Sequence, residues 1–209
     1  QVVRDGAQLL EVPPLGDRTG GVHITGGGTT IDGSLLAGAE NGLTIQSGAN
    51  TVDGLTIVNF PGNGIEIYGV AANDNLIGTA DLAGAANVIV RNGGSGIRVS
   101  GFDPRRNQFR RNEIHSNGGP GILIPDGGQQ GVQPPAIAAA DPVGGTTAPG
   151  ATVEVFHTVY SAGSVVSMVH LGTFVADAAG VFTTTLTVTA PPGSVEELSA
   201  TATDVNGNT

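Results

Sequence analysis

The 209-residue sequence contains no cysteine, no lysine and no tryptophan, and only 12% of its residues are charged. Without cysteine the chain forms neither disulfides nor thiolate metal sites, an absence that fits either redox compartment. No run of about 18 apolar residues occurs, so we expect no helix that spans a bilayer. The first residues show neither a signal-peptide pattern nor an initiator methionine, so we expect a mature product or an excised segment.

The charge balance is strongly acidic, with eight arginines against eighteen Asp and Glu residues and a formal net charge of -10. Binding to a nucleic-acid duplex needs several cations that neutralise phosphates, so this balance argues against nucleic acid as a partner. The hydrophobic share of 39% is high enough for a folded core. We therefore expect a folded protein with no nucleic-acid function.

A short apolar motif recurs through the first half of the chain, in the order Gly, aliphatic, any residue, Ile or Val. Its copies are GVHI at 21, GLTI at 42, GIEI at 64, GIRV at 96 and GILI at 121. Further apolar alternations led by Asn or Thr lie between the copies, giving three short strands per roughly 22 residues. Gly and Asn accept the left-handed backbone angles of tight turns. The pattern predicts a solenoid of about five coils of parallel strands, with an insertion around residues 78–85.

Strings such as NDNLIGTADLAGAANVIVRNGGSGIRVSG and NEIHSNGGPGILI resemble the coils of right-handed parallel β-helix repeat proteins, the architecture shared by pectate lyases. The resemblance covers about residues 21–125 and implies an all-β chain that begins with a short right-handed parallel β-helix. Residues 1–20 are then expected to form its N-terminal cap. The family includes lyases, epimerases, hydrolases, adhesins and inert spacers, so the resemblance leaves the function open.

The composition changes after residue 125. Residues 126–133 are rich in Pro, Gly and Gln and are expected to form a linker, whereas residues 134–209 alternate like the strands of an antiparallel β-sandwich. This part is similar to the Ig-like modules that follow β-helix repeats in large secreted bacterial proteins, but without their last strand. An open edge could then accept a strand from another copy, and the expected donor is the N-terminal segment with QVV at 1–3 and AQLLEVP at 7–13.

Candidate catalytic residues lie on the outer face of the predicted solenoid. The third residue of each motif should point outward, because side chains alternate along a strand. Glu66 could act as an acid or base, Arg98 could bind a uronate carboxylate, and Tyr68 could stack on a sugar ring. The simpler interpretation is a solvated cross-strand ion pair between Glu66 and Arg98. The outward ladder that contains them is His23, Thr44, Glu66, Arg98 and Leu123. The next residue of each motif should point inward, which predicts one internal column of Ile24, Ile45, Ile67, Val99 and Ile124.

Six of the eight arginines lie within residues 91–111, the basic island, where Asp103 is the only acidic residue. The island could bind an acidic polysaccharide, or the acidic surface of another protein, including further copies of this chain. Alternatively, these arginines only keep the solenoid soluble. The string GFDP at 101–104 resembles the GFDPH of alginate C5-epimerases, but Arg105 replaces the His, which argues against that activity. The candidate ligand-binding residues are Arg98, Arg105, Arg106, Arg110 and Arg111.

Metal ligands are sparse in the sequence. No two of the four histidines have the spacing of metal ligands. Asp32 and Asp53 lie in the matching strings IDG and VDG, so they are expected to stack in one turn, where calcium could relieve their repulsion. The string DVNGN at 204–208 resembles the start of a calcium loop but is more typical of a hairpin turn. We expect no cofactor, and calcium is the one metal that the pattern leaves open.

Three functional hypotheses follow. The favoured one is a secreted or cell-surface module with a structural, adhesive or assembly role and no catalysis. The second is a lyase or epimerase that acts on acidic polysaccharide, and the third is a glycan-binding module without catalysis. A stack of about five coils is only roughly 25 Å tall. Such a stack leaves little groove for several sugar subsites, which favours the first hypothesis.

Overall fold

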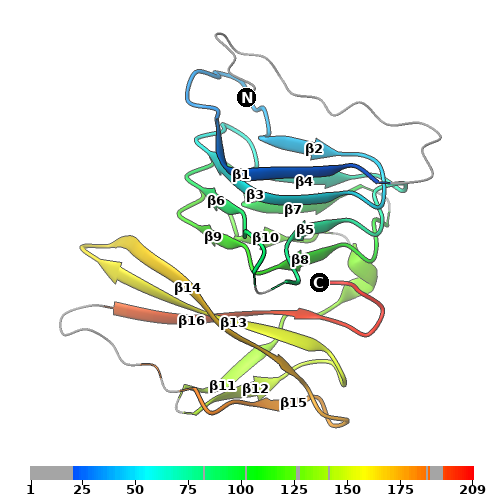
Figure 1. The fold of residues 1–209 in the computed structure, drawn as a ribbon, viewed down its shortest axis with the longest axis vertical. Coiled ribbons are helices and arrows are strands. Elements are labelled where there is room, and N and C mark those ends of the chain that lie inside the picture. The colour runs from blue at the N-terminus through cyan, green and yellow to red at the C-terminus, as the bar shows by residue number, and fades with distance from the viewer. Residues whose placement is uncertain are drawn as a thin grey trace. The chain divides into compact units, whose positions relative to one another are not determined.

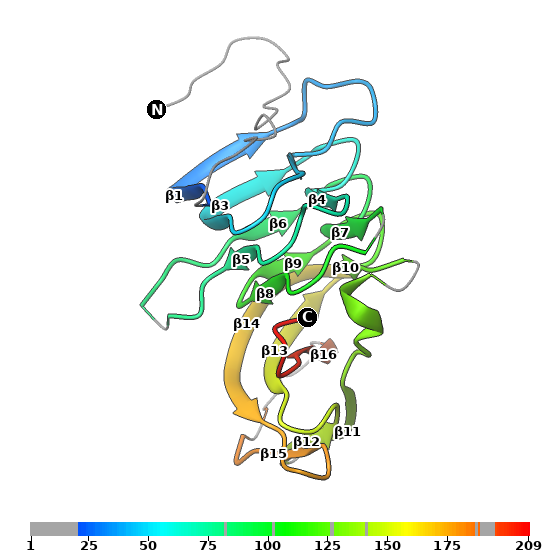
Figure 2. The same ribbon diagram turned by 90° about the vertical axis from the view of Figure 1, so that its right-hand side faces the viewer.

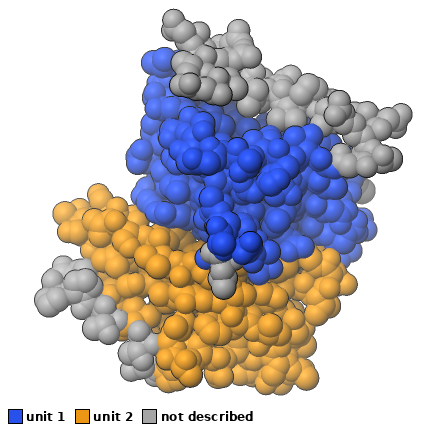
Figure 3. Space-filling model, in the orientation of Figure 1, with its two compact units in different colours: residues 1–130 blue, residues 131–209 orange. Residues whose placement is uncertain are grey.

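The computed structural model describes residues 21–81, 83–101, 103–125, 128–140, 142–186, 188 and 195–209. The chain divides into two compact units, unit 1 (residues 1–130) and unit 2 (residues 131–209), which Figure 3 colours separately. The described regular elements are strands, apart from one 3-10 helix at Gln129–Gly131. None of the described helical residues forms a segment long and apolar enough to cross a membrane. The predicted cap at 1–20, with the strand donor inside it, lies outside the described residues.

Unit 1 is a stack of parallel strands wound into successive coils (Figures 1 and 2). Every strand pairing in it is parallel, and each described coil contributes three short strand segments. The prediction of a parallel solenoid is therefore confirmed. One sheet contains β1 (His23–Asp32), β3 (Thr51–Val58), β5 (Leu76–Gly78), β6 (Val88–Val90), β8 (Gln108–Arg110) and β9 (Glu113–His115); the second contains β2 (Leu43–Ile45), β4 (Ile65–Tyr68), β7 (Ile97–Ser100) and β10 (Ile122–Leu123).

The long strand β3 explains how the first sheet makes two faces. Its first residues, Thr51 and Val52, pair with β5, whereas its last three residues pair with β6. Between the two halves lies Gly54, whose φ of 64° is readily adopted only by a residue without a Cβ atom. The bend at Gly54 becomes a full break in the next coil, where residues 79–87 connect β5 to β6. This connection is the predicted insertion.

The core of unit 1 consists of aliphatic columns that run through the coils. Ile45, Ile67 and Val99 follow one another in register, as expected, and are 6%, 0% and 0% exposed. Each coil buries its inward side chains against the next, so the coils depend on one another for burial. The other columns are Leu43–Ile65–Ile97–Ile122, Ile24–Val52–Ile77–Phe109 and Ile31–Ile57–Ile89–Ile114.

The first copy of the motif lies on a different face from the other copies. His23 pairs with Thr51 and Ile24 with Val52, so both residues belong to the sheet of β3 and not to the predicted ladder and column of β4. An apolar alternation after a glycine specifies a strand, but it does not specify which face of a coil that strand occupies. The described residues therefore form four coils and not about five.

Stacked asparagines line the turns of the coils. The Nδ2 of Asn50 donates to Oδ1 of Asn75 at 2.8 Å, the Nδ2 of Asn75 donates to Oδ1 of Asn107 at 2.8 Å, and Gln129 accepts from Asn107 at 3.2 Å. These four side chains are at most 7% exposed. Their oxygens also accept backbone N–H groups of the preceding coil, which satisfies donors that the turns leave unpaired. Gln129 thus extends the ladder into the segment whose composition predicts a linker.

Unit 2 contains two antiparallel sheets that share one apolar core. The first has the order β11 (Ala136–Ala140), β12 (Val143–Thr146) and β15 (Val181–Thr183), and the second has the order β14 (Ser164–Val175), β13 (Thr152–Ser161) and β16 (Val195–Thr203). Val143, Val153 and Phe182 are nearly inaccessible in this core. Both sheets contribute to it, so unit 2 is a two-layered antiparallel structure.

Candidate functional site

The strongest candidate site lies on the outer face of the second sheet, where β4 and β7 are neighbours. Glu66 is in register with Arg98, and Tyr68 is in register with Ser100. The structure thus brings the three candidate catalytic residues onto one surface. Glu66 and Tyr68 lie in β4, and Arg98 lies in β7 of the next coil. Figure 1 shows these two strands side by side in the stack.

The carboxylate of Glu66 is held by side chains from both neighbouring coils. The Nδ2 of Asn41 donates to Oε2 at 2.7 Å, and the Oγ of Ser100 donates to Oε1 at 2.7 Å. The Nε of Arg98 lies 3.7 Å from Oε1. Glu66 is only 21% exposed and so lies partly sheltered among these donors. Both of its oxygens are therefore engaged in contacts between coils.

Asn41 is a site residue that the sequence reasoning missed. Its Oδ1 accepts the backbone N–H of Asn63 at 2.8 Å, while its Nδ2 donates to Glu66. Asn41 and Asn63 each stand directly before the glycine of a motif copy. That repeated Asn-Gly pair was the available signal, because equivalent positions of successive coils stack on one another.

Tyr68 presents an exposed aromatic surface beside this carboxylate. Its side chain is 49% exposed, and the neighbouring Val70 is 63% exposed. A Cβ atom at Gly101 would lie 3.1 Å from Cε2 of Tyr68, so the ring packs closely over a glycine of the next coil. Tyr68 is therefore fixed in place while part of its ring remains open to solvent.

The chemistry available on this face is limited. A general base needs a lone pair directed at a substrate proton, but both Glu66 oxygens already accept hydrogen bonds from the protein. Arg98 faces Glu66 through a solvent-shielded Nε, although its side chain as a whole is 41% exposed. One carboxylate thus joins three coils through hydrogen bonds and an ion pair. This arrangement is more typical of a structural contact between coils than of an activated acid or base.

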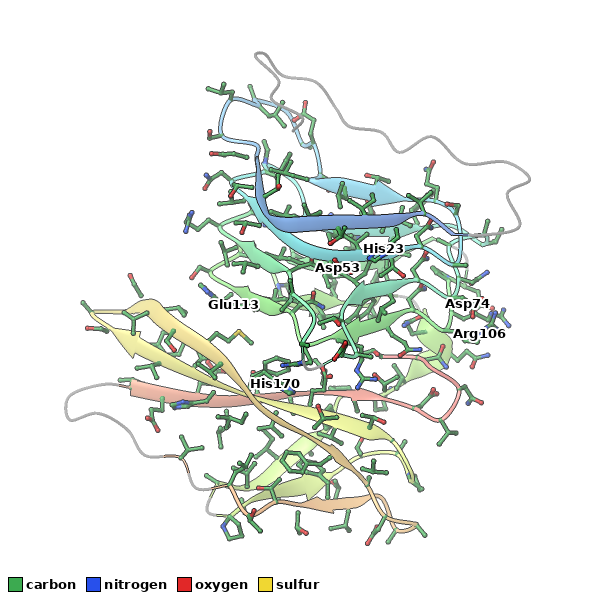
Figure 4. All side chains as sticks on the ribbon, in the orientation of Figure 1. His23, Asp53, Asp74, Arg106, Glu113 and His170 are labelled. Carbon is green, nitrogen blue, oxygen red and sulfur yellow. The ribbon has the colours of Figure 1, made fainter. Side chains whose placement is uncertain are left out.

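The arginines of the basic island also contact neighbouring turns of the same chain. Arg106 donates from Nε and Nη2 to the two carboxylate oxygens of Asp74, at 2.6 Å and 2.8 Å, which is a bidentate pair between successive coils (Figure 4). Arg105 is bonded to Asp103, and Arg111 donates from Nη1 to the carbonyl oxygen of Asp81 at 2.7 Å. Arg110 lies in β8, in register with Gly78. At least three of the six arginines, Arg98, Arg105 and Arg106, therefore form ion pairs within the β-helix.

A family model described as a right-handed beta helix region matches residues 20–133. The chain belongs to the right-handed β-helix family. This match covers more than half of the chain, and it agrees with the parallel coils of unit 1. No curated protein matches the sequence.

The predicted stacking of Asp32 and Asp53 in the β-helix is wrong. Asp32 is in register with Val58, and Asp53 is in register with Thr25, because β1 has a register shift between Thr25 and Thr29. The two carboxylates therefore do not stack on one another. No group of three potential metal ligands occurs among the residues that the structure describes. The Nε2 of His23 lies 2.6 Å from Oδ2 of Asp53 (Figure 4).

Local donors lower the pKa of several aspartates in the β-helix. The hydrogen bond from Asn59, helped by the backbone N–H of Ser34, lowers the pKa of Asp32. The hydrogen bond from Arg106 does the same for the pKa of Asp74. These groups stabilise the fold above the ordinary Asp pKa of about 3.9, and that contribution is lost as the pH falls through their lower folded-state values.

The string DVNGN in unit 2 forms a closed turn. Oδ1 of Asp204 accepts the backbone N–H groups of Asn206 and Asn208, at 2.8 Å and 2.9 Å, and the Nδ2 of Asn208 donates to Oδ2 at 3.0 Å. Donors rather than oxygens surround the carboxylate. This geometry fits a turn stabilised by an aspartate better than the first half of a calcium loop.

Proposed function

We propose that the chain is a non-catalytic structural module of a secreted or cell-surface protein, in which the β-helix serves as a rigid scaffold for adhesion or assembly. The observation that carries the proposal is the set of donors around Glu66. The side chains of Asn41 and Ser100 occupy its two oxygens, and both come from neighbouring coils. The most chemically promising residue of the outer face is therefore used to join coils.

The distribution of the other polar groups supports the same role. Asn75 and Asn107 are 1% and 0% exposed and are bonded to each other across coils. The guanidinium of Arg106 forms two hydrogen bonds with the carboxylate of Asp74. A scaffold benefits from such ties because each coil contacts only its neighbours, so stability depends on the interfaces between coils.

For unit 2 we propose an Ig-like module. Two antiparallel sheets of three strands each pack over one core, which is the layer arrangement of such sandwiches. Such a module would act as a compact spacer that follows the β-helix in the sequence. The absence of cysteine means that its core is held without disulfides.

The experiment is to incubate the protein with uronate polymers and to follow both product formation and binding. We expect no turnover by the wild type and no change in the Glu66→Gln or Arg98→Ala variants. A saturable turnover that either variant abolishes would contradict the proposal. Binding without turnover, weakened by salt and by Tyr68→Ala but not by Tyr160→Ala in unit 2, would assign the outer face to glycan recognition instead.

A further inference from the structure

The edge strand β14 of unit 2 is the longest strand that the structure describes, with 12 residues. It pairs with β13 on one side, and no described strand pairs with its other side. None of its residues is buried, and Val166, Val169 and Val175 are 60%, 49% and 68% exposed. An open strand edge offers backbone donors and acceptors to any further strand that approaches it.

The charges of unit 2 distinguish β14 from the opposite edge of the same sheet. The sequence SVVSMVHLGTFV of β14 contains no Asp, Glu, Arg or Lys. At the other edge, β16 carries Glu196 and Glu197 beside the exposed Val195. Charged residues on an edge strand oppose pairing with a further strand. One edge of this sheet is therefore protected by carboxylates, and the other is neutral and apolar.

Two bulges divide β14 into shorter regular segments. The register with β13 shifts between Val155 and Phe156 and again between Val159 and Tyr160, and each shift leaves one additional residue on β14. The segment 167–170 lies between the two bulges, and the segment 172–175 follows the second of them in the sequence of β14. A partner strand can pair with such regular segments, and the bulges restrict the register in which it does so.

We propose that β14 is a self-association edge through which two copies of this chain pair, antiparallel about a two-fold axis. The joined sheets would have the order β16-β13-β14 followed by the same strands of the second copy in reverse. A second copy is the occupant that the charges favour. Two chains of net charge -10 repel one another, and a strand without charges is the surface at which they meet with the least repulsion. This inference concerns unit 2 and does not depend on whether the β-helix binds a glycan.

The test is the molar mass of the full chain, measured by light scattering over a concentration series near neutral pH. We expect a concentration-dependent dimer for the wild type. Val169→Glu on β14 should weaken dimerisation by at least about tenfold, because it places a carboxylate in the neutral edge. Val195→Glu on β16 adds the same charge to the protected edge and should leave the dimer unchanged. Val175→Glu repeats the β14 test at a second exposed position within a regular segment, and circular dichroism checks that each variant is folded.

Salt dependence separates this edge from an interface of ion pairs. Raising the ionic strength from about 0.01 M to about 1 M screens the repulsion between the acidic chains, so a dimer built on β14 should strengthen or stay constant. A dimer that weakens with salt would point to the basic island and would overturn the proposal. A wild type that stays monomeric at every concentration, or folded β14 variants that dimerise like Val195→Glu, would also overturn it.

Discussion

Ile67→Asp is expected to destabilise unit 1 by at least about 4 kcal/mol. Ile67 is fully buried and lies in register between Ile45 and Val99, in the middle of a column that joins three coils. An aspartate at this position buries a carboxylate without a partner and also removes the apolar contacts of both neighbouring coils. The expected result is a β-helix that no longer folds, or that folds only at low denaturant.

The fluorescence of Tyr68 measures this effect in unit 1, because the chain has only two tyrosines and no tryptophan. In a Tyr160→Phe background, denaturant titration of Tyr68 emission follows the β-helix without a signal from unit 2. The matched control is Thr56→Asp, which adds the same charge to a half-buried position on the outer side of the next face. Equal losses in Ile67→Asp and Thr56→Asp would contradict the assignment of the inner column.

Asn107→Ala is expected to reduce the stability of unit 1 by about 3 to 5 kcal/mol. Its Oδ1 accepts from the backbone N and the Nδ2 of Asn75, at 3.1 Å and 2.8 Å, and its Nδ2 donates to the carbonyl oxygen of Ala72 at 2.9 Å. Asn107 is 0% exposed, so water cannot replace these bonds. The truncation leaves three buried polar groups without their partner.

The same Tyr68 titration measures the loss for Asn107→Ala, and Thr30→Ala in β1 is its control. Thr30 is an exposed strand residue of the same unit, so its side chain can be removed without leaving a buried polar group unpaired. We expect the control to change stability by less than about 0.5 kcal/mol. A loss of similar size in the two variants would show that the asparagine ladder contributes little.

Much of the β-helix follows from the sequence, because its period and alternation are both visible there. The column through Ile45, Ile67 and Val99 and the pairing of Glu66 with Arg98 come directly from the repeated motif. The position of His23 does not follow, since the motif leaves open which of the three faces a strand occupies. The coil count was too high for the same reason.

The role of the arginines was harder to predict than their clustering. The pairing of Arg106 with Asp74 depends on two turn residues with left-handed φ angles of 54° and 60°, which stack although 32 residues separate them. The order of charges along the sequence shows only that Arg106, in the basic island, is 32 residues away from Asp74. Turn register, and not composition, decides that Arg106 faces a carboxylate of the neighbouring coil.

The measurement that tests the central claim most directly is the unfolding free energy of Glu66→Ala, followed by Tyr68 emission. If Glu66 joins neighbouring coils, its removal leaves the donors of Asn41 and Ser100 without an acceptor. The free energy of unfolding should then fall by about 1 to 3 kcal/mol. Residues placed for catalysis often cost stability, so removing one tends to raise it. A clear gain in stability for Glu66→Ala would contradict the structural role proposed for this face.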